Sequence, residues 1–110
     1  MRLKQYITED ASFLLKKHGI SKVKMLTDPE EMEIGMTMFE EPPEGKAFLF
    51  VFPDEGFRPF FTEGMKFPID IHFFDSQGRH VGRFLNAVPG LKEINSPRPF
   101  RYALEIPHGD

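Results

Sequence analysis

Proline and glycine interrupt this chain so often that long regular elements have little room. Ten prolines and nine glycines are spread over 110 residues, and both residue types break helices and central strands. The pattern favours short strands joined by turns. Thirteen phenylalanines, against two tyrosines and no tryptophan, are expected to fill the core, because a phenylalanine side chain has no polar group that needs a partner.

Two short helices are expected, both in the N-terminal part. The first has Thr8 as its N-cap, acids in its first turn, lysines in its last turn and a stop at Gly19. The second begins at Asp28, which can cap it, with Pro29 in the first helical position. The stretch from Asp28 to Glu44 contains seven acids and no base, which we interpret as a solvated helix face and loop.

Six short segments have the composition or the alternation of strands. They are residues 22–26, 48–52, 57–61, 69–74, 79–86 and 100–106. The turn at residues 75–78 predicts a hairpin, and Gly82 within its second strand suggests a bulge. We therefore predict a mainly β (α+β) fold: one compact, strongly curved antiparallel sheet, barrel-like or sandwich-like, with two short N-terminal helices.

Two segments that alternate clearly, residues 69–74 and 100–106, predict which side chains face solvent. In residues 69–74, the side of Asp70, His72 and Phe74 is opposite to the apolar side, and we expect His72 to be partly exposed. In residues 100–106, an inward set and an outward set alternate. The inward set is Phe100, Tyr102, Leu104 and Ile106, and the outward set is Arg101, Ala103 and Glu105.

Composition also removes several classes of function. The absence of cysteine excludes disulfides, thiolate zinc sites and iron–sulfur clusters. The first residues lack the apolar stretch of a signal peptide, and no run is long and apolar enough to span a membrane. We therefore expect a cytoplasmic protein with no membrane partner.

The order of the segments resembles that of the domain-of-unknown-function 192 family of small prokaryotic proteins. The matching pieces are DPEEMEIGM, FLFVFPDEG, RPFFTEGMKFPIDIHFFD, DSQGR and YALEIPHG, within about residues 22–109. The resemblance implies a compact, mostly β domain and implies no activity. We expect residues 1–110 to form a single domain, with residues 1–21 as a helical extension outside the resemblance.

Asp70 and His72 are the best candidates for chemistry, with Glu63 and Lys66 in the loop before them. A carboxylate beside an imidazole can orient the imidazole for general acid or base catalysis. The alternative is structural: Asp70 caps the turn from Glu63 to Pro68 by accepting backbone hydrogen bonds. An enzyme that uses these four residues is thus one hypothesis, and we lean against it.

We expect no metal and no cofactor. The histidines have neither HxH nor HExxH spacing, although His80 could lie across the hairpin from His72 and near it. Serine nucleophile and phosphate-loop motifs are also absent from the sequence.

A non-enzymatic module that binds a small ligand or a protein is the function that we favour. Phe57, Phe60 and Phe61 could form an exposed aromatic rim for that purpose, unless all three pack in the core. A third hypothesis is single-stranded nucleic-acid binding on a basic, aromatic β face, with Arg79, Arg83, Lys92, Arg98 and Arg101. The net charge of −3 argues against nucleic acid. We expect a monomer or a weak homo-oligomer.

Overall fold

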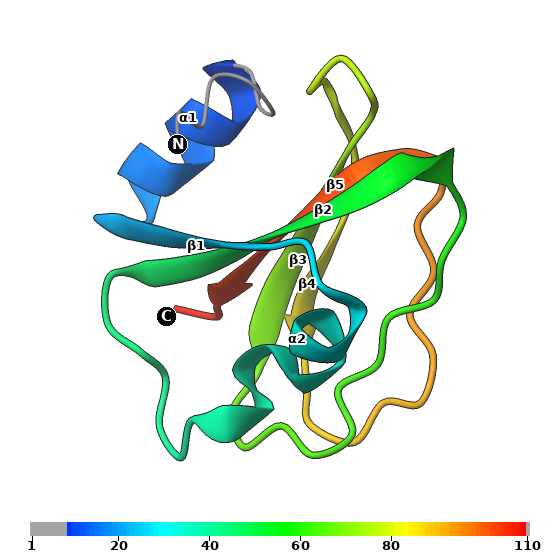
Figure 1. Cartoon of the computed structure of the whole chain (residues 1–110). Helices are drawn as coiled ribbons and strands as arrows, with labels where there is room; N and C mark the ends of the chain where they lie inside the picture. Colours follow the sequence, from blue (N-terminus) through cyan, green and yellow to red (C-terminus); the bar gives the residue numbers. More distant parts are fainter. Residues whose placement is uncertain (1–8, 110) are drawn as a thin grey trace.

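The chain is built around one open five-stranded sheet. The computed structural model describes residues 9–109, and the strands are β1 (Lys22–Leu26), β2 (Lys46–Gly56), β3 (Ile69–Phe74), β4 (His80–Ala87) and β5 (Phe100–Pro107). They lie in the order β1-β2-β5-β3-β4 (Figure 1). The mainly β prediction is confirmed. The predicted closure is wrong, because β1 and β4 end the sheet and it does not curl into a barrel or a sandwich.

The sheet is mixed rather than antiparallel. Strand β1 runs parallel to β2, whereas the other neighbouring pairs are antiparallel. Parallel neighbours need a crossover connection. Here the crossover is the second helical region, made of α2 (Pro29–Ile34) and the 3-10 helix η2 (Gly35–Met38). The prediction failed at this pair because it treated that helix as an N-terminal addition instead of a connection between two strands.

Both predicted helices are present. Helix α1 spans Glu9–Lys17, and its proposed cap, Thr8, lies outside the described residues. In α2 the Asp28 carboxylate accepts a hydrogen bond from the backbone N–H of Glu31 at 3.2 Å, and Pro29 opens the helix, as predicted. No helix within residues 9–109 has the length and apolar composition needed to cross a membrane.

The helices cover opposite faces of the sheet, as Figure 1 shows. On one face, Met36 of η2 packs with Phe50 and Phe73 in the larger core cluster. On the other, Ala11 of α1 packs with Leu104 in a second cluster. The strands at the centre of the sheet are therefore buried on both sides: all six residues of β3 are buried.

This double cover corrects the expected exposure of three residues. His72, Ala103 and Glu105 were expected to face solvent, yet their exposed fractions are 2%, 0% and 5%. Alternation shows which side chains share a face, but a face that a helix covers is as buried as the main core. The proposal that the His72 side of β3 is an outer face is therefore wrong.

The aromatic segment 57–61 is not a strand. Its only pairing is an isolated bridge between Phe60 and Ile94. Thr62, which is fully buried, fixes the segment by donating from its hydroxyl to the carbonyl of Val88 and accepting from the N–H of Leu91. Pro59 explains the missing ladder, since it cannot donate a strand hydrogen bond.

The predicted hairpin joins β3 to β4 through the turn at Asp75. Its register shifts between Phe73, which pairs with Gly82, and Phe74, which pairs with His80, so a bulge adjoins Gly82 as predicted. Gly82 is also required by a close approach: a Cβ there would lie 2.5 Å from the ring of Pro97.

Candidate functional site

Asp70 ties β3 to its surroundings. Its buried Oδ1 accepts a hydrogen bond from the backbone N–H of Asn86 and lies near Nδ1 of His108, both at 2.8 Å. The predicted hydrogen bonds to the turn from Glu63 to Pro68 are wrong: the partners come from β4 and from the C-terminal end. Asn86 has a positive φ of 54°, so the carboxylate fixes an irregular part of β4.

His72 forms a pair with His80, which confirms their predicted proximity. Nδ1 of His72 lies 3.1 Å from Nε2 of His80. Burial, followed by the nearby His80, lowers the pKa of His72 to about 4. Nε2 of His72 is buried without a hydrogen-bond partner, while the backbone N–H of His80 donates to Asp10 of α1. The pair is thus a neutral contact under α1, and residues 9–109 contain no cluster of three or more metal-ligating side chains.

Glu63 and Lys66 lie on the other face of the sheet from Asp70 and His72. Both are exposed. The Lys66 ammonium donates to the carbonyl of Thr37 at 3.3 Å, on the side of η2. The structure therefore does not bring the four candidate catalytic residues together.

The three candidate rim residues have different environments. Phe60 is in the larger core cluster with 8% of its surface exposed, whereas Phe57 and Phe61 are 66% and 42% exposed. Phe60 and Phe61 line one pocket, and Phe57 is not among its lining residues. The three rings therefore do not all pack in the core, and their role in binding stays a prediction.

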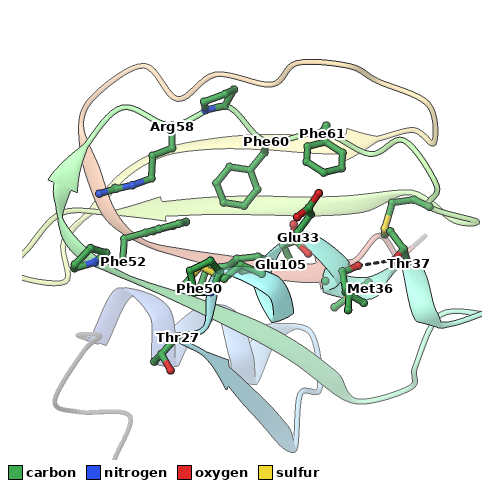
Figure 2. Close-up of a pocket in the computed structure, with 17 residues that line it drawn as sticks. Thr27, Glu33, Met36, Thr37, Phe50, Phe52, Arg58, Phe60, Phe61 and Glu105 are labelled. Carbon is green, nitrogen blue, oxygen red and sulfur yellow. Dashed lines mark hydrogen bonds between the residues drawn. The ribbon is translucent and has the colours of Figure 1, made fainter.

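The pocket that Phe60 and Phe61 line opens on the α2 face of the sheet and has a volume of about 360 Å³. We call this cavity the phenylalanine pocket. It is lined by four phenylalanine rings, three methionines and one buried carboxyl: Phe50, Phe52, Phe60, Phe61, Met32, Met36, Met65 and Glu105. Figure 2 shows Phe60 and Phe61 on the segment that crosses the pocket, with Phe50 and Glu105 on the strands of the sheet. An apolar cavity with few polar groups is typical of small-molecule sites.

Glu105 is the buried carboxyl of the phenylalanine pocket. Its neighbours on the adjacent strands are apolar, Phe48 on β2 and Ile71 on β3. Burial raises the pKa of Glu105 to about 8, and no charge or hydrogen bond within the described residues contributes to that shift. At neutral pH the free protein therefore holds this carboxyl mostly in its protonated form.

The junction between α2 and η2 brings the backbone close to Glu105. Gly35 has a positive φ of 49°. A Cβ at Gly35 would lie 3.6 Å from Cζ of Phe50 and 3.7 Å from Oε1 of Glu105. The helical crossover thus forms one wall of the pocket beside the carboxyl.

Arg58 lines the same pocket, but its charge is already countered. Its guanidinium donates to the carbonyls of Phe100 and Asp54 at 2.9 and 2.7 Å and forms an ion pair with the Asp54 carboxylate. It also lies 4.3 Å from the ring centroid of Phe52. Arg58 is therefore a fixed part of the wall rather than a counter-ion for Glu105.

Glu105 was not among the site residues expected from the sequence. The alternation of residues 100–106 placed it on a solvent face together with Arg101 and Ala103. No local signal marked Glu105 as buried, because an acid that alternates with apolar residues, as in YALEI, is the ordinary pattern of a strand with one solvated face.

The predicted basic residues are partly engaged in local contacts. Arg79 pairs with Asp75 at 3.0 Å, and Arg101 donates to the carbonyl of Phe52 at 3.1 Å. Arg83, Lys92 and Arg98 are exposed. Nucleic-acid binding, the alternative that the net charge disfavours, stays untested.

This chain was compared with models of protein families and with curated proteins. A family model described as an uncharacterized ACR matches residues 13–110, so the similarity begins within α1, earlier than the residue 22 expected from the motifs. A search of curated proteins gave no match.

Similar crystal structures include a "putative transcription regulator" from Sinorhizobium meliloti 1021, at 27% identity and a TM-score of 0.73, over 79% of this chain and 68% of that one. A protein of unknown function from Novosphingobium aromaticivorans DSM 12444 has 22% identity and a TM-score of 0.73, over 79% of this chain and 63% of that one. This chain thus spans less than two thirds of the Novosphingobium protein.

Proposed function

We propose that this chain, which belongs to the domain-of-unknown-function 192 family, is a non-enzymatic module that binds a small organic ligand in the phenylalanine pocket. One observation carries the proposal: an open, largely apolar cavity ends on a buried carboxyl, Glu105, that has no partner of its own. Such a cavity gives a ligand both apolar contact and one polar group that fixes its orientation.

The mouth of the pocket supports this proposal. Ile34 and Phe61, which line it, are 50% and 42% exposed. Exposed apolar side chains that adjoin a cavity gain free energy when a ligand covers them, at roughly 25 cal/mol per Å². A bound ligand would therefore close the apolar surface that the free protein leaves open.

An enzyme is the less supported alternative. Active sites that use acid–base catalysis typically combine the acid or base with further positioned polar groups. Glu105 is the one buried titratable group that lines the phenylalanine pocket. Asp70 and His72 lie on the opposite face, where Asn86, His108 and His80 already contact them.

Methionine methyl groups offer a direct test of binding. Met32, Met36 and Met65 line the pocket, whereas Met25 and Met38 do not. Two matched probes are titrated against protein with isotope-labelled methionine methyls: para-tert-butylbenzyl alcohol, and the cation in which nitrogen replaces the central carbon of the tert-butyl group. We expect the NMR shifts of the three pocket methyls to move with at least one probe, with little change at Met25 and Met38.

Two matched variants locate the binding site. Phe61→Ala removes a pocket wall and should weaken binding of the probes. Phe57→Ala removes an exposed ring of the same segment that lies outside the pocket, and it should leave binding unchanged. If neither probe moves the three pocket methyls, or if Phe57→Ala weakens binding as much as Phe61→Ala does, the proposed function is wrong.

A further inference from the structure

We infer that the ligand of the phenylalanine pocket is an organic cation, with an ammonium or guanidinium group on an apolar body, whose charge pairs with Glu105. This inference rests on the proposed function and adds the chemical class of the ligand. It stands on three features of the pocket: an acid without a counter-charge, aromatic walls, and an acidic surround.

The first feature is that no cation within the described residues serves Glu105. On the adjacent strands its direct neighbours, Phe48 and Ile71, are apolar. The charged side chains that line the same pocket are Glu33 of α2, which has the wrong sign, and Arg58, which pairs with Asp54.

The other cations on this side of the sheet are bound to other groups or are exposed, and Lys66 donates to the carbonyl of Thr37. Lys46 of β2 lies over the rings of Phe39 and Phe48, at 5.5 and 5.6 Å. Arg101 of β5 donates to the carbonyl of Phe52, and Lys24 of β1 is exposed. A buried acid that has no partner is costly to keep, and an incoming cation supplies the partner.

The second feature is the aromatic wall. The faces of phenylalanine rings attract cations, most strongly where water is excluded. This pocket already uses that attraction, because the guanidinium of Arg58 lies 4.3 Å from the centroid of Phe52. Phe50, Phe60 and Phe61 offer further ring surface around the free volume.

The third feature is the charge of the surrounding chain. The crossover that forms one wall belongs to the stretch from Asp28 to Glu44, which contains seven acids and no base. Of these seven acids, Glu33 is the one that lines the cavity, and its side chain is exposed. The resulting field attracts a cation toward the mouth and repels an anion.

A neutral ligand is the competing occupant, since an amide or a hydroxyl could hydrogen-bond to the protonated carboxyl. The two cases differ in their response to pH. A cation binds the ionised form of Glu105 and displaces its proton, so the apparent Kd scales inversely with the ionised fraction. With the pKa of free Glu105 at about 8, that fraction rises from about one tenth at pH 7 to about nine tenths at pH 9.

The test compares the two matched probes at pH 7, 8 and 9 by the methionine methyl titration. The cationic probe carries a permanent charge, so only the protein titrates. We expect its Kd to fall about tenfold from pH 7 to pH 9, and to be at least tenfold below the Kd of the neutral alcohol at pH 9. The Kd of the alcohol should stay level or rise.

The Glu105→Gln variant should bind the cation with no dependence on pH across this range, and Glu33→Gln should retain that dependence. If Glu105→Gln does not fold, the comparison of the two probes on the unchanged protein decides alone. Equal affinity for both probes at pH 9, or a pH response that survives in folded Glu105→Gln, would overturn the inference while leaving the proposed function intact.

The same chemistry could come from a free amine or from a lysine side chain of another protein. Acetyl-lysine-amide, which carries its ammonium at the end of a side chain, is titrated in parallel. Tighter binding of this compound than of the cationic probe would identify a lysine as the source, and weaker binding would assign the pocket to a small aryl or alkyl ammonium compound.

Discussion

Replacing Glu105 with glutamine should stabilise the free protein increasingly as the pH rises. The pKa of Glu105 is raised from 4.5 in the unfolded chain to about 8 in the folded protein. The folded state therefore keeps a proton that the unfolded chain releases. The stabilisation that protonated Glu105 contributes to the free energy of unfolding is fully present below pH 4.5 and is lost as the pH rises toward 8.

The size of the effect follows from the shift. Each pH unit between the two pKa values is worth about 1.4 kcal/mol, so the loss reaches about 3 kcal/mol at pH 7 and about 5 kcal/mol above pH 8. Glutamine keeps the size and cannot ionise. The free energy of unfolding of Glu105→Gln minus that of the unchanged protein should therefore grow by about 1.4 kcal/mol per unit from pH 5 to pH 8.

Urea denaturation followed by far-ultraviolet circular dichroism at four pH values measures this difference. Glu33→Gln is the matched control, because Glu33 lines the same pocket but is exposed, and this variant should keep the pH dependence that Glu105 gives to the unchanged protein. Parallel pH profiles for Glu105→Gln and the unchanged protein would show that the folded and unfolded states titrate alike, and the description of a buried, unpaired carboxyl would be refuted.

Three further predictions concern stability. Asp70→Asn should destabilise by about 1 to 3 kcal/mol, because it loses the charge that accepts a hydrogen bond from Asn86; an unchanged urea midpoint would contradict the structural role. The pKa of His72 is about 4 in the folded protein, against the ordinary value of 6.5. As the pH drops, His72 is therefore protonated in the unfolded chain before it is protonated in the folded protein. The free energy of unfolding should fall by up to about 3 kcal/mol between pH 6.5 and pH 4. His72→Leu should lose less over the same range, and an identical acid profile would exclude His72 as the cause. Gly82→Ala should cost about 1 to 3 kcal/mol in a thermal or urea melt, since its Cβ meets Pro97 at 2.5 Å, whereas a neutral result would show that the Pro97 loop yields freely.

Local signals predicted the elements well. Asp28 and Pro29 marked the start of α2, and the hairpin turn at Asp75 was evident because the residues involved act within a few positions of themselves. The alternation of β3 also gave the right partition of its side chains, with Ile71 in one cluster and Phe74 in the other.

Contacts between distant segments could not be predicted in the same way. Parallel pairing of β1 with β2 depends on where α2 lies across the sheet. No residue within β1 indicates the direction in which this strand pairs. Likewise the burial of His72 and Glu105 follows from α1 and α2 covering both faces. The candidate site shifted for this reason: Asp70 was found from its sequence setting, whereas Glu105 became notable only when the crossover was placed over it.

The pKa of Glu105, measured with and without the cationic probe, tests the central claim most directly. NMR of isotope-labelled glutamate carboxyl groups gives the value in the free protein and in protein saturated with the probe. We predict a pKa of about 8 in the free protein and a clear decrease in this pKa when the cation fills the pocket. A free value near the ordinary 4.5, or a value that does not change when the cation is bound, would contradict it.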